Sequence, residues 1–323
     1  MNPAVFLNAL NATIAELKYG EKPVELYEPI QYLMDLSGKR IRPLMALLAY
    51  NLFDDQWQNA VKPALAVEVF HNFTLMHDDI MDKAPLRRGK PTVHEKWNEN
   101  IAILSGDVML VQAYELLLEV SPEKLKLVMS RFNKTAAEVC EGQQFDMNFE
   151  LKETVTEEDY IEMIRLKTSV LLGFSLELGA IIANASLENS RILYDIGVNI
   201  GLGFQLKDDL LDVYGDPEKF GKQIGGDIIA NKKTFMLIEA QLKADSLTQQ
   251  KLNDWLNKKE FNSSEKVKAV TEIFDQLEIR QIAENKINFY FDKALASLKQ
   301  LEANESKKQE LEHFILKLID REA

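Results

Sequence analysis

The segment VEVFHNFTLMHDDIMD, residues 67–82, is largely apolar at first and then carries three aspartates. On an α-helix, Asp78 and Asp82 would share one face, a single turn apart. At ~6 Å and an effective dielectric constant of about 20, the two charges repel each other by ~3 kcal/mol. A bound cation would relieve this repulsion. Mg²⁺ is the expected ion, because it binds to one or two carboxylates and completes its coordination with water and phosphate. We therefore expect a partly buried helix that ends at a magnesium site. A solvated acidic helix end is the plainer interpretation of one such cluster alone.

A second acidic cluster repeats this arrangement in FQLKDDLLDVYGD, residues 204–216. Asp208, Asp209 and Asp212 again follow an apolar helical segment, and Gly215 again interrupts the pattern. If the two helices lie side by side, six carboxylates face a common cavity. Their mutual repulsion is too strong unless several divalent cations are bound between them. Several Mg²⁺ ions in turn require an anionic ligand, and diphosphate is the natural one. Two such clusters are far more specific than one.

Basic residues flank both clusters, although the chain as a whole is acidic. In GKRIRP, residues 38–43, the cations Lys39, Arg40 and Arg42 surround the start of an apolar helix, where Pro43 is favourable. A bound anion would offset this positive charge, which otherwise opposes the helix dipole. The remaining basic positions are Arg87 and Arg88 after Pro85, and Lys222, Lys232 and Lys233 around Gly225 and Gly226. Together they predict anion binding, but the last stretch lacks the GxxxxGK[ST] order of a nucleotide P-loop.

The residues on either side of the first cluster carry two further expectations. His71 lies seven residues before Asp78, two turns along nearly the same helix face. A lone histidine there is usually a core residue, yet its alignment with the carboxylates makes a hydrogen bond to diphosphate an equal alternative. Pro85 is expected to end the helix, so that the two arginines after it turn back over the cavity.

Helical spacing of apolar residues dominates the chain, whereas alternating strand patterns are hard to find. Glycine and proline fall between the periodic segments, and there is no linker, repeat or low-complexity tract. We expect one all-α domain over residues 1–323, a central helical bundle wrapped by other helices. From about Lys243 onward the composition becomes more polar while the pattern stays amphipathic, which predicts peripheral helices.

Composition restricts the partners and the compartment. The 323 residues include 38 Lys and Arg against 51 Asp and Glu, a net charge of −13, so a nucleic-acid partner is not expected. The single Cys140 excludes an internal disulfide and fits a reducing compartment. The first twenty residues read as an amphipathic helix, not as a signal peptide. The most apolar run begins at Ser169 and contains Glu177, which favours a buried helix over a membrane span. We expect a cytoplasmic protein without stable membrane insertion.

Taken together, these motifs resemble the trans-type isoprenyl diphosphate synthases, the family of farnesyl and geranylgeranyl diphosphate synthases. The matching pieces appear in family order between Gly38 and Thr234. They are GKRIRP, HDDIMD with LRRGKPT, EGQQFD, the Lys167–Thr168 pair, FQLKDDLLD, and GKQIGGD with NKKT. The resemblance implies an all-α fold around a central active-site cavity, a homodimer, and a Mg²⁺-dependent enzyme. Its reaction would join isopentenyl diphosphate head to tail to an allylic diphosphate, and no side chain is an obvious general base.

The resemblance also implies a role for each motif residue. Asp78, Asp82 and Asp208 would bind Mg²⁺, and Asp79, Asp209 and Asp212 would support them or act through water. The positions that match the allylic diphosphate site are Arg87, Lys167, Thr168, Gln205, Lys222 and Lys232. The positions that match the isopentenyl diphosphate site are Lys39, Arg42, His71 and Arg88.

Product length is expected to depend on the apolar helix before Asp78. The ideal helix wheel places Thr74 nearer the aspartate face, whereas the resemblance points to Phe73, where an aromatic side chain shortens the product. We follow the resemblance and expect Phe73 to limit the product. The first acidic motif also lacks the two-residue insertion of many bacterial farnesyl diphosphate synthases, and together these features favour geranylgeranyl diphosphate as the product. The alternative role for Phe73 is plain core packing. The alternative functions are a farnesyl diphosphate synthase, a class I terpene cyclase and a non-catalytic subunit of a heteromeric synthase. The Asp208–Asp212 motif argues against the cyclase, and the intact clusters argue against the non-catalytic subunit.

Overall fold

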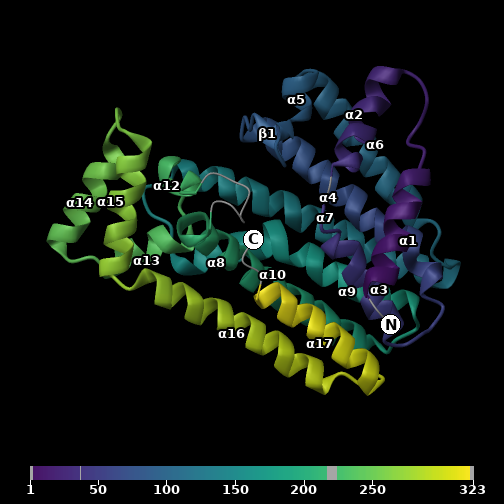
Figure 1. Cartoon of the computed structure of the whole chain (residues 1–323). Helices are drawn as coiled ribbons and strands as arrows, with labels where there is room; N and C mark the ends of the chain where they lie inside the picture. The colour runs from purple at the N-terminus through teal and green to yellow at the C-terminus, as the bar shows by residue number, and fades with distance from the viewer. Residues whose placement is uncertain (1–2, 37, 217–223, 321–323) are drawn as a thin grey trace. The chain divides into compact units, whose positions relative to one another are not determined.

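The computed structural model describes residues 3–36, 38–216 and 224–320, so the predicted site residue Lys222 lies outside the described residues. Helices make up nearly all of the described structure (Figure 1). The strands in these ranges are β1 (Leu86–Arg87) and β2 (Lys90–Pro91), which form a short antiparallel hairpin. The prediction of an all-α fold is confirmed.

The chain divides into two compact units, each built from separate stretches of sequence. The first unit comprises residues 1–136, 171–197 and 298–313, and the second comprises 137–170, 198–297 and 314–323, as far as these are described. The expectation of one domain over the whole chain stays a prediction.

The first unit contains the helices of the N-terminal part of the chain. They are α1 (Pro3–Glu16), α2 (Val24–Asp35), α3 (Ile41–Asn51), the 3₁₀ helix η1 (Trp57–Ala60), α4 (Val61–Met81), α5 (Val93–Lys96) and α6 (Glu99–Leu117). The first half of α7 (Pro122–Leu151), nearly all of α9 (Val170–Ile182), the start of α10 (Leu187–Tyr214) and the first part of α17 (Glu305–Ile319) also belong to it.

Helix α4 is the centre of the first unit, because its side chains are buried on nearly all sides. It packs mainly against α6 and also against α3, as Figure 1 shows. The approach to α6 is close at Gly106, where a Cβ atom would lie 2.3 Å from Nε2 of His77. The core of this unit is aromatic: Phe132 meets Phe70 edge to face at 5.1 Å and lies 5.7 Å from Phe174. Such pairs add stability beyond the area that they bury.

The C-terminus of α4 is closed by its own backbone. Lys83 adopts a left-handed conformation with φ of 51°, and its N–H donates to the carbonyl of Ile80. The next N–H, of Ala84, donates to the carbonyl of Asp79 at 2.9 Å. These two bonds form a Schellman motif, which ends the helix at Met81. Pro85 was expected to end this helix but lies after its cap, at the start of the turn into the hairpin.

The second unit contains the helices that carry the later motifs. They are α8 (Glu157–Ile164), the π-helical turn η2 (Arg165–Ser169), α12 (Gly226–Ile229), α13 (Phe235–Lys243), α14 (Ser246–Asn257), α15 (Ser263–Gln276) and most of α16 (Ile279–Gln300). The second halves of α7 and α10 and the end of α17 also belong to it. Side-chain caps begin three of these helices, at Thr156, Asp245 and Asn262.

Two local expectations are confirmed by the structure. Residues 169–181 are buried throughout, so the most apolar run is a core helix, in which Glu177 pairs with Arg131 at 3.1 Å. The polar last third forms helices with one buried face each. In the described part of the chain, α6 alone is long and apolar enough to cross a membrane by length and composition, a test that core helices of soluble proteins also pass.

Candidate active site

The first acidic motif spans the end of α4. The N–H of Asp82 donates to the carbonyl of Asp78 at 2.8 Å, which places the two residues one turn apart on a common face. Asp79 points elsewhere: its side chain is 3 % exposed and accepts two hydrogen bonds from Arg87, from Nε at 2.8 Å and from Nη2 at 2.7 Å. Burial raises the pKa of Asp79, and Arg87 opposes that shift. The outer two aspartates therefore form a pair, and the middle one anchors the β1 strand.

The predicted arginines of the first unit gather around His71. Nη1 of Arg42 lies 3.1 Å from Nε2 of His71. Because arginine can only donate, Nε2 is the acceptor and the ring proton lies on Nδ1. Burial lowers the pKa of His71 well below its usual range, with further contributions first from Arg42 and then from Arg87 and Arg88. A neutral histidine among these arginines marks a strongly electropositive site.

Arg40, one of the three cations of GKRIRP, has a different role. It is 6 % exposed and adopts a left-handed conformation with φ of 48°. Its guanidinium pairs with Glu68 of α4 at 2.7 Å and donates to the carbonyl of Met34. Arg88 donates to the nearby carbonyl of Leu36 at 3.1 Å. Arg40 thus ties the loop to α4, and the loop carries the predicted ligands Lys39 and Arg42 beside it.

The two candidates for control of product length differ in their surroundings. Phe73 is 9 % exposed, and its ring packs against Phe70 at 5.6 Å and against His77 at 4.8 Å. The hydroxyl of Thr74 donates to the carbonyl of His71, within its own helix. Phe73 is therefore the bulkier surface at this level of α4.

The second acidic motif has the same internal arrangement in the second unit. Asp208 and Asp212 stand one turn apart on α10, and Oδ2 of Asp212 accepts from the N–H of Asp227 at 3.0 Å. Asp209 is 4 % exposed and accepts from the hydroxyl of Tyr160 and from Nε2 of Gln205. Burial raises the pKa of Asp209 well above its usual range, and the charge of Asp227 adds to that effect.

The Lys167–Thr168 pair lies in the π-helical turn η2. Such turns are frequent at functional sites. Nζ of Lys167 pairs with Asp146 of α7 at 2.6 Å, and the hydroxyl of Thr168 donates to Oε1 of Gln205 at 3.3 Å. The turn approaches α7 at Gly142, where a Cβ atom would lie 2.2 Å from the backbone nitrogen of Lys167. The predicted residues Lys167, Thr168 and Gln205 are therefore brought together with Asp209.

The last basic group follows α12. The N–H of Lys232 donates to the carbonyl of Asp227 at 2.9 Å, and Lys232 lines a small crevice together with Asp227 and Thr234. Nζ of Lys233 donates to the carbonyl of Phe149 at 2.6 Å. The turn between Asp227 and Thr234 thus connects the second acidic motif to α7 as well.

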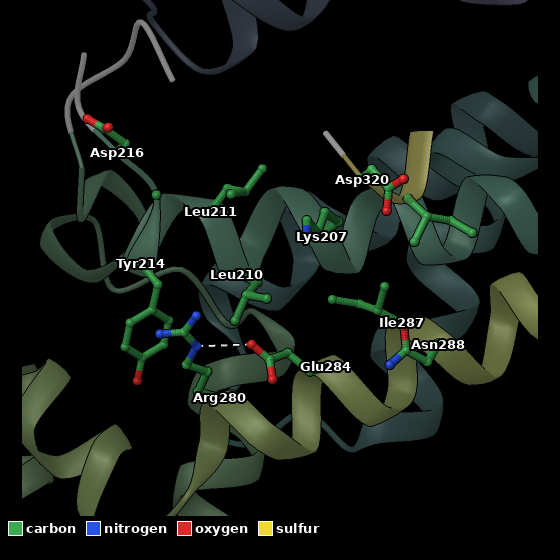
Figure 2. Close-up of a pocket in the computed structure, with 12 residues that line it drawn as sticks. Lys207, Leu210, Leu211, Tyr214, Asp216, Arg280, Glu284, Ile287, Asn288 and Asp320 are labelled. Atoms are coloured by element: carbon green, nitrogen blue, oxygen red, sulfur yellow. Dashed lines mark hydrogen bonds and ion pairs between the residues drawn. The ribbon is translucent and has the colours of Figure 1, made fainter. Parts of the chain in front are cut away.

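A separate cavity of about 620 Å³ lies on another face of α10 (Figure 2). Its walls include Lys207 and Tyr214 of α10 and Arg280 and Glu284 of α16. Arg280 donates to Glu284 at 3.0 Å and stacks near the ring of Tyr214. As far as the described residues show, this cavity contains none of the predicted site residues.

The donor set fits a hard divalent cation that keeps some of its water. Within the described ranges, no three His, Cys, Asp or Glu side chains are gathered closely enough to hold a metal ion by themselves. Each motif offers an outer pair of carboxylates, because the middle aspartate is occupied. Mg²⁺ commonly binds one or two carboxylates, with water and substrate phosphates as its other ligands.

Sequence comparison places the chain in a known family. A family model described as polyprenyl synthetase matches residues 23–274. A geranylgeranyl diphosphate synthase of Methanosarcina mazei is 43 % identical over 233 residues, which cover 72 % of each chain. The chain belongs to the polyprenyl synthetase family. It is accordingly a prenyltransferase of the trans-isoprenyl diphosphate synthase type.

Solved structures agree with this assignment. A crystal structure of geranylgeranyl pyrophosphate synthase is 41 % identical, with a TM-score of 0.92 and full coverage of both chains. A polyprenyl synthase from Caulobacter crescentus, complexed with calcium and isoprenyl diphosphate, is 28 % identical with a TM-score of 0.89. That match covers 99 % of this chain and 96 % of the other.

Sequence reasoning missed the residues that hold the motif side chains in place. Tyr160 and Asp209 are 49 positions apart, and Asp146 and Lys167 are 21 positions apart. Asp146 ends the EGQQFD motif, which was recognised without a role. Tyr160 carried no signal beyond being an aromatic residue one helix before the Lys167–Thr168 pair.

Proposed function

We propose that this enzyme makes geranylgeranyl diphosphate by adding isopentenyl diphosphate to an allylic diphosphate (dimethylallyl, geranyl or farnesyl). The observation that carries the proposal is the arrangement shared by the two acidic motifs. In each motif the outer aspartates stand one turn apart at the end of a helix. The middle aspartate is buried and accepts a hydrogen bond from a side chain of another segment. The names of the similar proteins support geranylgeranyl diphosphate as the product.

The two diphosphates would bind to different sets of side chains. The isopentenyl diphosphate would bind to Lys39, Arg42, His71 and Arg88, of which the two arginines lower the pKa of His71. The allylic diphosphate would bind to Arg87, Lys167, Thr168, Gln205, Lys222 and Lys232. Of these, Arg87 and Lys167 are already oriented by carboxylates, so their positively charged ends are fixed before substrate arrives.

The proposed cofactor is Mg²⁺, held by Asp78, Asp82 and Asp208, with Asp79, Asp209 and Asp212 in support. Bound there, the metal would neutralise negative charge on the departing diphosphate. The protein's own cations contribute in the same direction, since preformed positive groups stabilise charge that develops in the transition state. The allylic carbocation that remains is attacked by the double bond of isopentenyl diphosphate. The proton would then be lost to the released diphosphate, as the resemblance to the family implies, so no side chain is proposed as the general base.

Phe73 would set the product length as the floor of the space for the growing chain. Its ring is backed by Phe70, which is itself buried, so it cannot move aside without disturbing the core. The alternative product is farnesyl diphosphate, which a floor nearer to the aspartates would favour.

We further propose a cytoplasmic homodimer that pairs through α6. Leu104, Val111 and Leu118 repeat every seven residues and are 57 %, 57 % and 56 % exposed. This spacing places them along one face of the helix. A second copy covering that face would account for the apolar character of α6 without any membrane. Replacing Val111 with lysine should shift the mass measured by light scattering from dimer to monomer, and an unchanged mass would contradict this interface.

The function is tested by incubating the purified protein with Mg²⁺, isopentenyl diphosphate and each allylic diphosphate in turn. The expected result is geranylgeranyl diphosphate as the main product, and no product when the divalent cation is chelated. A cyclic hydrocarbon would indicate a class I terpene cyclase instead. Failure to elongate any primer would indicate a non-catalytic subunit and would overturn the proposal.

A further inference from the structure

A lysine in α15, Lys266, has its ammonium group buried inside the protein. Lys266 is 0 % exposed. Its Nζ donates to the carbonyl of Ile229 at 3.2 Å and to Oδ1 of Asn231 at 2.6 Å. It also lies 4.3 Å from the centroid of the Phe261 ring. Among the described residues, no carboxylate stands within ion-pair distance of it.

Burying an ammonium group is costly unless its donors are satisfied. The burial lowers the pKa of Lys266, which is the expected sign for a desolvated cation. A methionine, which is also unbranched and nearly as long, would fill most of the same space without that cost. The two hydrogen bonds therefore point to a specific use, and both of them end on residues 229–231, at the end of α12 and just before Lys232.

Asn231 connects Lys266 to the end of α14. It adopts a left-handed conformation with φ of 54°. While its Oδ1 accepts from Lys266, its Nδ2 donates to the carbonyl of Leu256 at 3.0 Å, at the end of α14. The side chain is thus held at both of its polar atoms by the α14–α15 hairpin, which lies beside α12 and α13 in Figure 1.

The segment held in this way carries one residue of the proposed site, Lys232, and is hydrogen-bonded to a second, Asp212. Asn231 immediately precedes Lys232, whose N–H is bonded to the carbonyl of Asp227. The N–H of Asp227 in turn donates to Oδ2 of Asp212 in the second acidic motif. A change at Lys266 would therefore act on the turn that carries the predicted diphosphate ligand Lys232, and the bond from Asp227 links the same segment to Asp212 of the metal site.

We propose that Lys266 is a positioning residue, which fixes the turn at residues 229–231 and thereby places Lys232 for the allylic diphosphate. The inference rests on the proposed function. It gives the α14–α15 hairpin, which carries none of the recognised motifs, a part in substrate binding.

The first test replaces Lys266 with methionine, which keeps the length and removes the donors. We expect the KM for the allylic diphosphate to rise about tenfold, equivalent to ~1.4 kcal/mol, while the KM for isopentenyl diphosphate changes less than about twofold. Hydrogen exchange of the peptide covering residues 225–234 should also become faster. The matched control is Lys268→Met on the same helix, where the side chain is 79 % exposed and neither quantity should change.

A second variant distinguishes the effect of the side-chain hydrogen bonds of Asn231 from the effect of its left-handed backbone conformation. Asn231→Gly retains access to the left-handed region but loses both side-chain bonds. It should reproduce the change in allylic KM, whereas Asn184→Gly, at an exposed position with φ of 61°, should not. Equal changes in both KM values, or unaltered exchange of residues 225–234 in Lys266→Met, would overturn the inference. Failure of the unmodified enzyme to elongate any primer would instead overturn the proposed function, and the exchange measurement would still decide the role of Lys266.

Discussion

Asp79 and Asp209 occupy the same place in their motifs, and both are buried, with 3 % and 4 % of their surface exposed. Each is held by a donor from another segment, Arg87 in one unit and Tyr160 in the other. A DDxxD motif in this enzyme therefore consists of two kinds of residue. The outer aspartates remain one helical turn apart for a ligand, and the middle one attaches the helix end to its surroundings.

The first prediction concerns the donor to Asp209. Tyr160→Phe leaves a buried carboxyl without one of its hydrogen bonds, which should lower the free energy of unfolding by about 1–3 kcal/mol. Urea denaturation measures this change. Tyr214→Phe is the control, because that hydroxyl donates to Asp275 at an exposed position and its loss should cost less. Equal losses in the two variants would show that burial of the Asp209 contact is unimportant.

The second prediction concerns Phe73. Phe73→Ala should yield products longer than geranylgeranyl diphosphate, because the aromatic floor is removed while the ring of Phe70 lies deeper. Thr74→Ala should leave the product unchanged, since its hydroxyl is bonded within the helix. Chromatography of the dephosphorylated products measures their chain length. This length does not depend on how much of the variant enzyme is folded. An unchanged product from Phe73→Ala would contradict the assignment of the floor.

The third prediction concerns the outer aspartates. Mg²⁺ together with inorganic diphosphate should raise the melting temperature of the unmodified protein, because a ligand that binds only the folded state stabilises it. Asp82→Asn and Asp208→Asn should each reduce that rise and lower kcat by about 10²–10³. Asp254→Asn, at an exposed position of α14, serves as the control. A full thermal shift in both variants would mean that the metal binds elsewhere.

The fourth prediction concerns the pH dependence of stability through His71. Burial lowers the pKa of this side chain in the folded protein, whereas in the unfolded chain it stays near ~6.5. Below that pH the unfolded state binds a proton that the folded state does not, so stability is lost as the pH falls. The slope from this one group is at most ~1.4 kcal/mol per pH unit.

His71→Gln keeps an acceptor for Arg42 but does not titrate, so its free energy of unfolding should fall less steeply from pH 7.5 to pH 5.5. His313→Gln, at an exposed position, should follow the unmodified protein. Urea unfolding at several pH values provides the comparison. Parallel curves for all three proteins would exclude His71 as the source of the slope.

The sequence predicted the all-α class and the two motif helices because periodicity and residue spacing are local properties. It predicted Asp78 and Asp82 as a pair for the same reason. The arrangement of the middle aspartates could not be predicted, because Asp209 depends on Tyr160 from a helix 49 positions away. Spacing alone suggested that all six carboxylates face one cavity, and the structure turns two of them inward.

The burial of Lys266 is a second feature that could not be predicted from the local sequence. In SSEKVKAV it looks like an ordinary lysine on an amphipathic helix, where most such side chains are exposed. Its neighbour Lys268 fits that expectation, with 79 % of its side chain exposed. Which of two lysines is buried depends on what packs against the helix, here the turn after α12, and that information is not local.

The π-helical turn Arg165–Ser169 has a consequence for how this region can change. A turn with one extra residue advances the register of everything after it, and each α-helical residue corresponds to a rotation of about 100°. Deleting a single residue between Ile164 and Lys167 would restore a regular helix and turn each later residue of that helix by about 100°. The side chains of α9, which are buried on all sides, would then each meet different neighbours, so an indel here is far more disruptive than a substitution. The length of this stretch therefore matters as much to the proposed active site as the identities of Lys167 and Thr168.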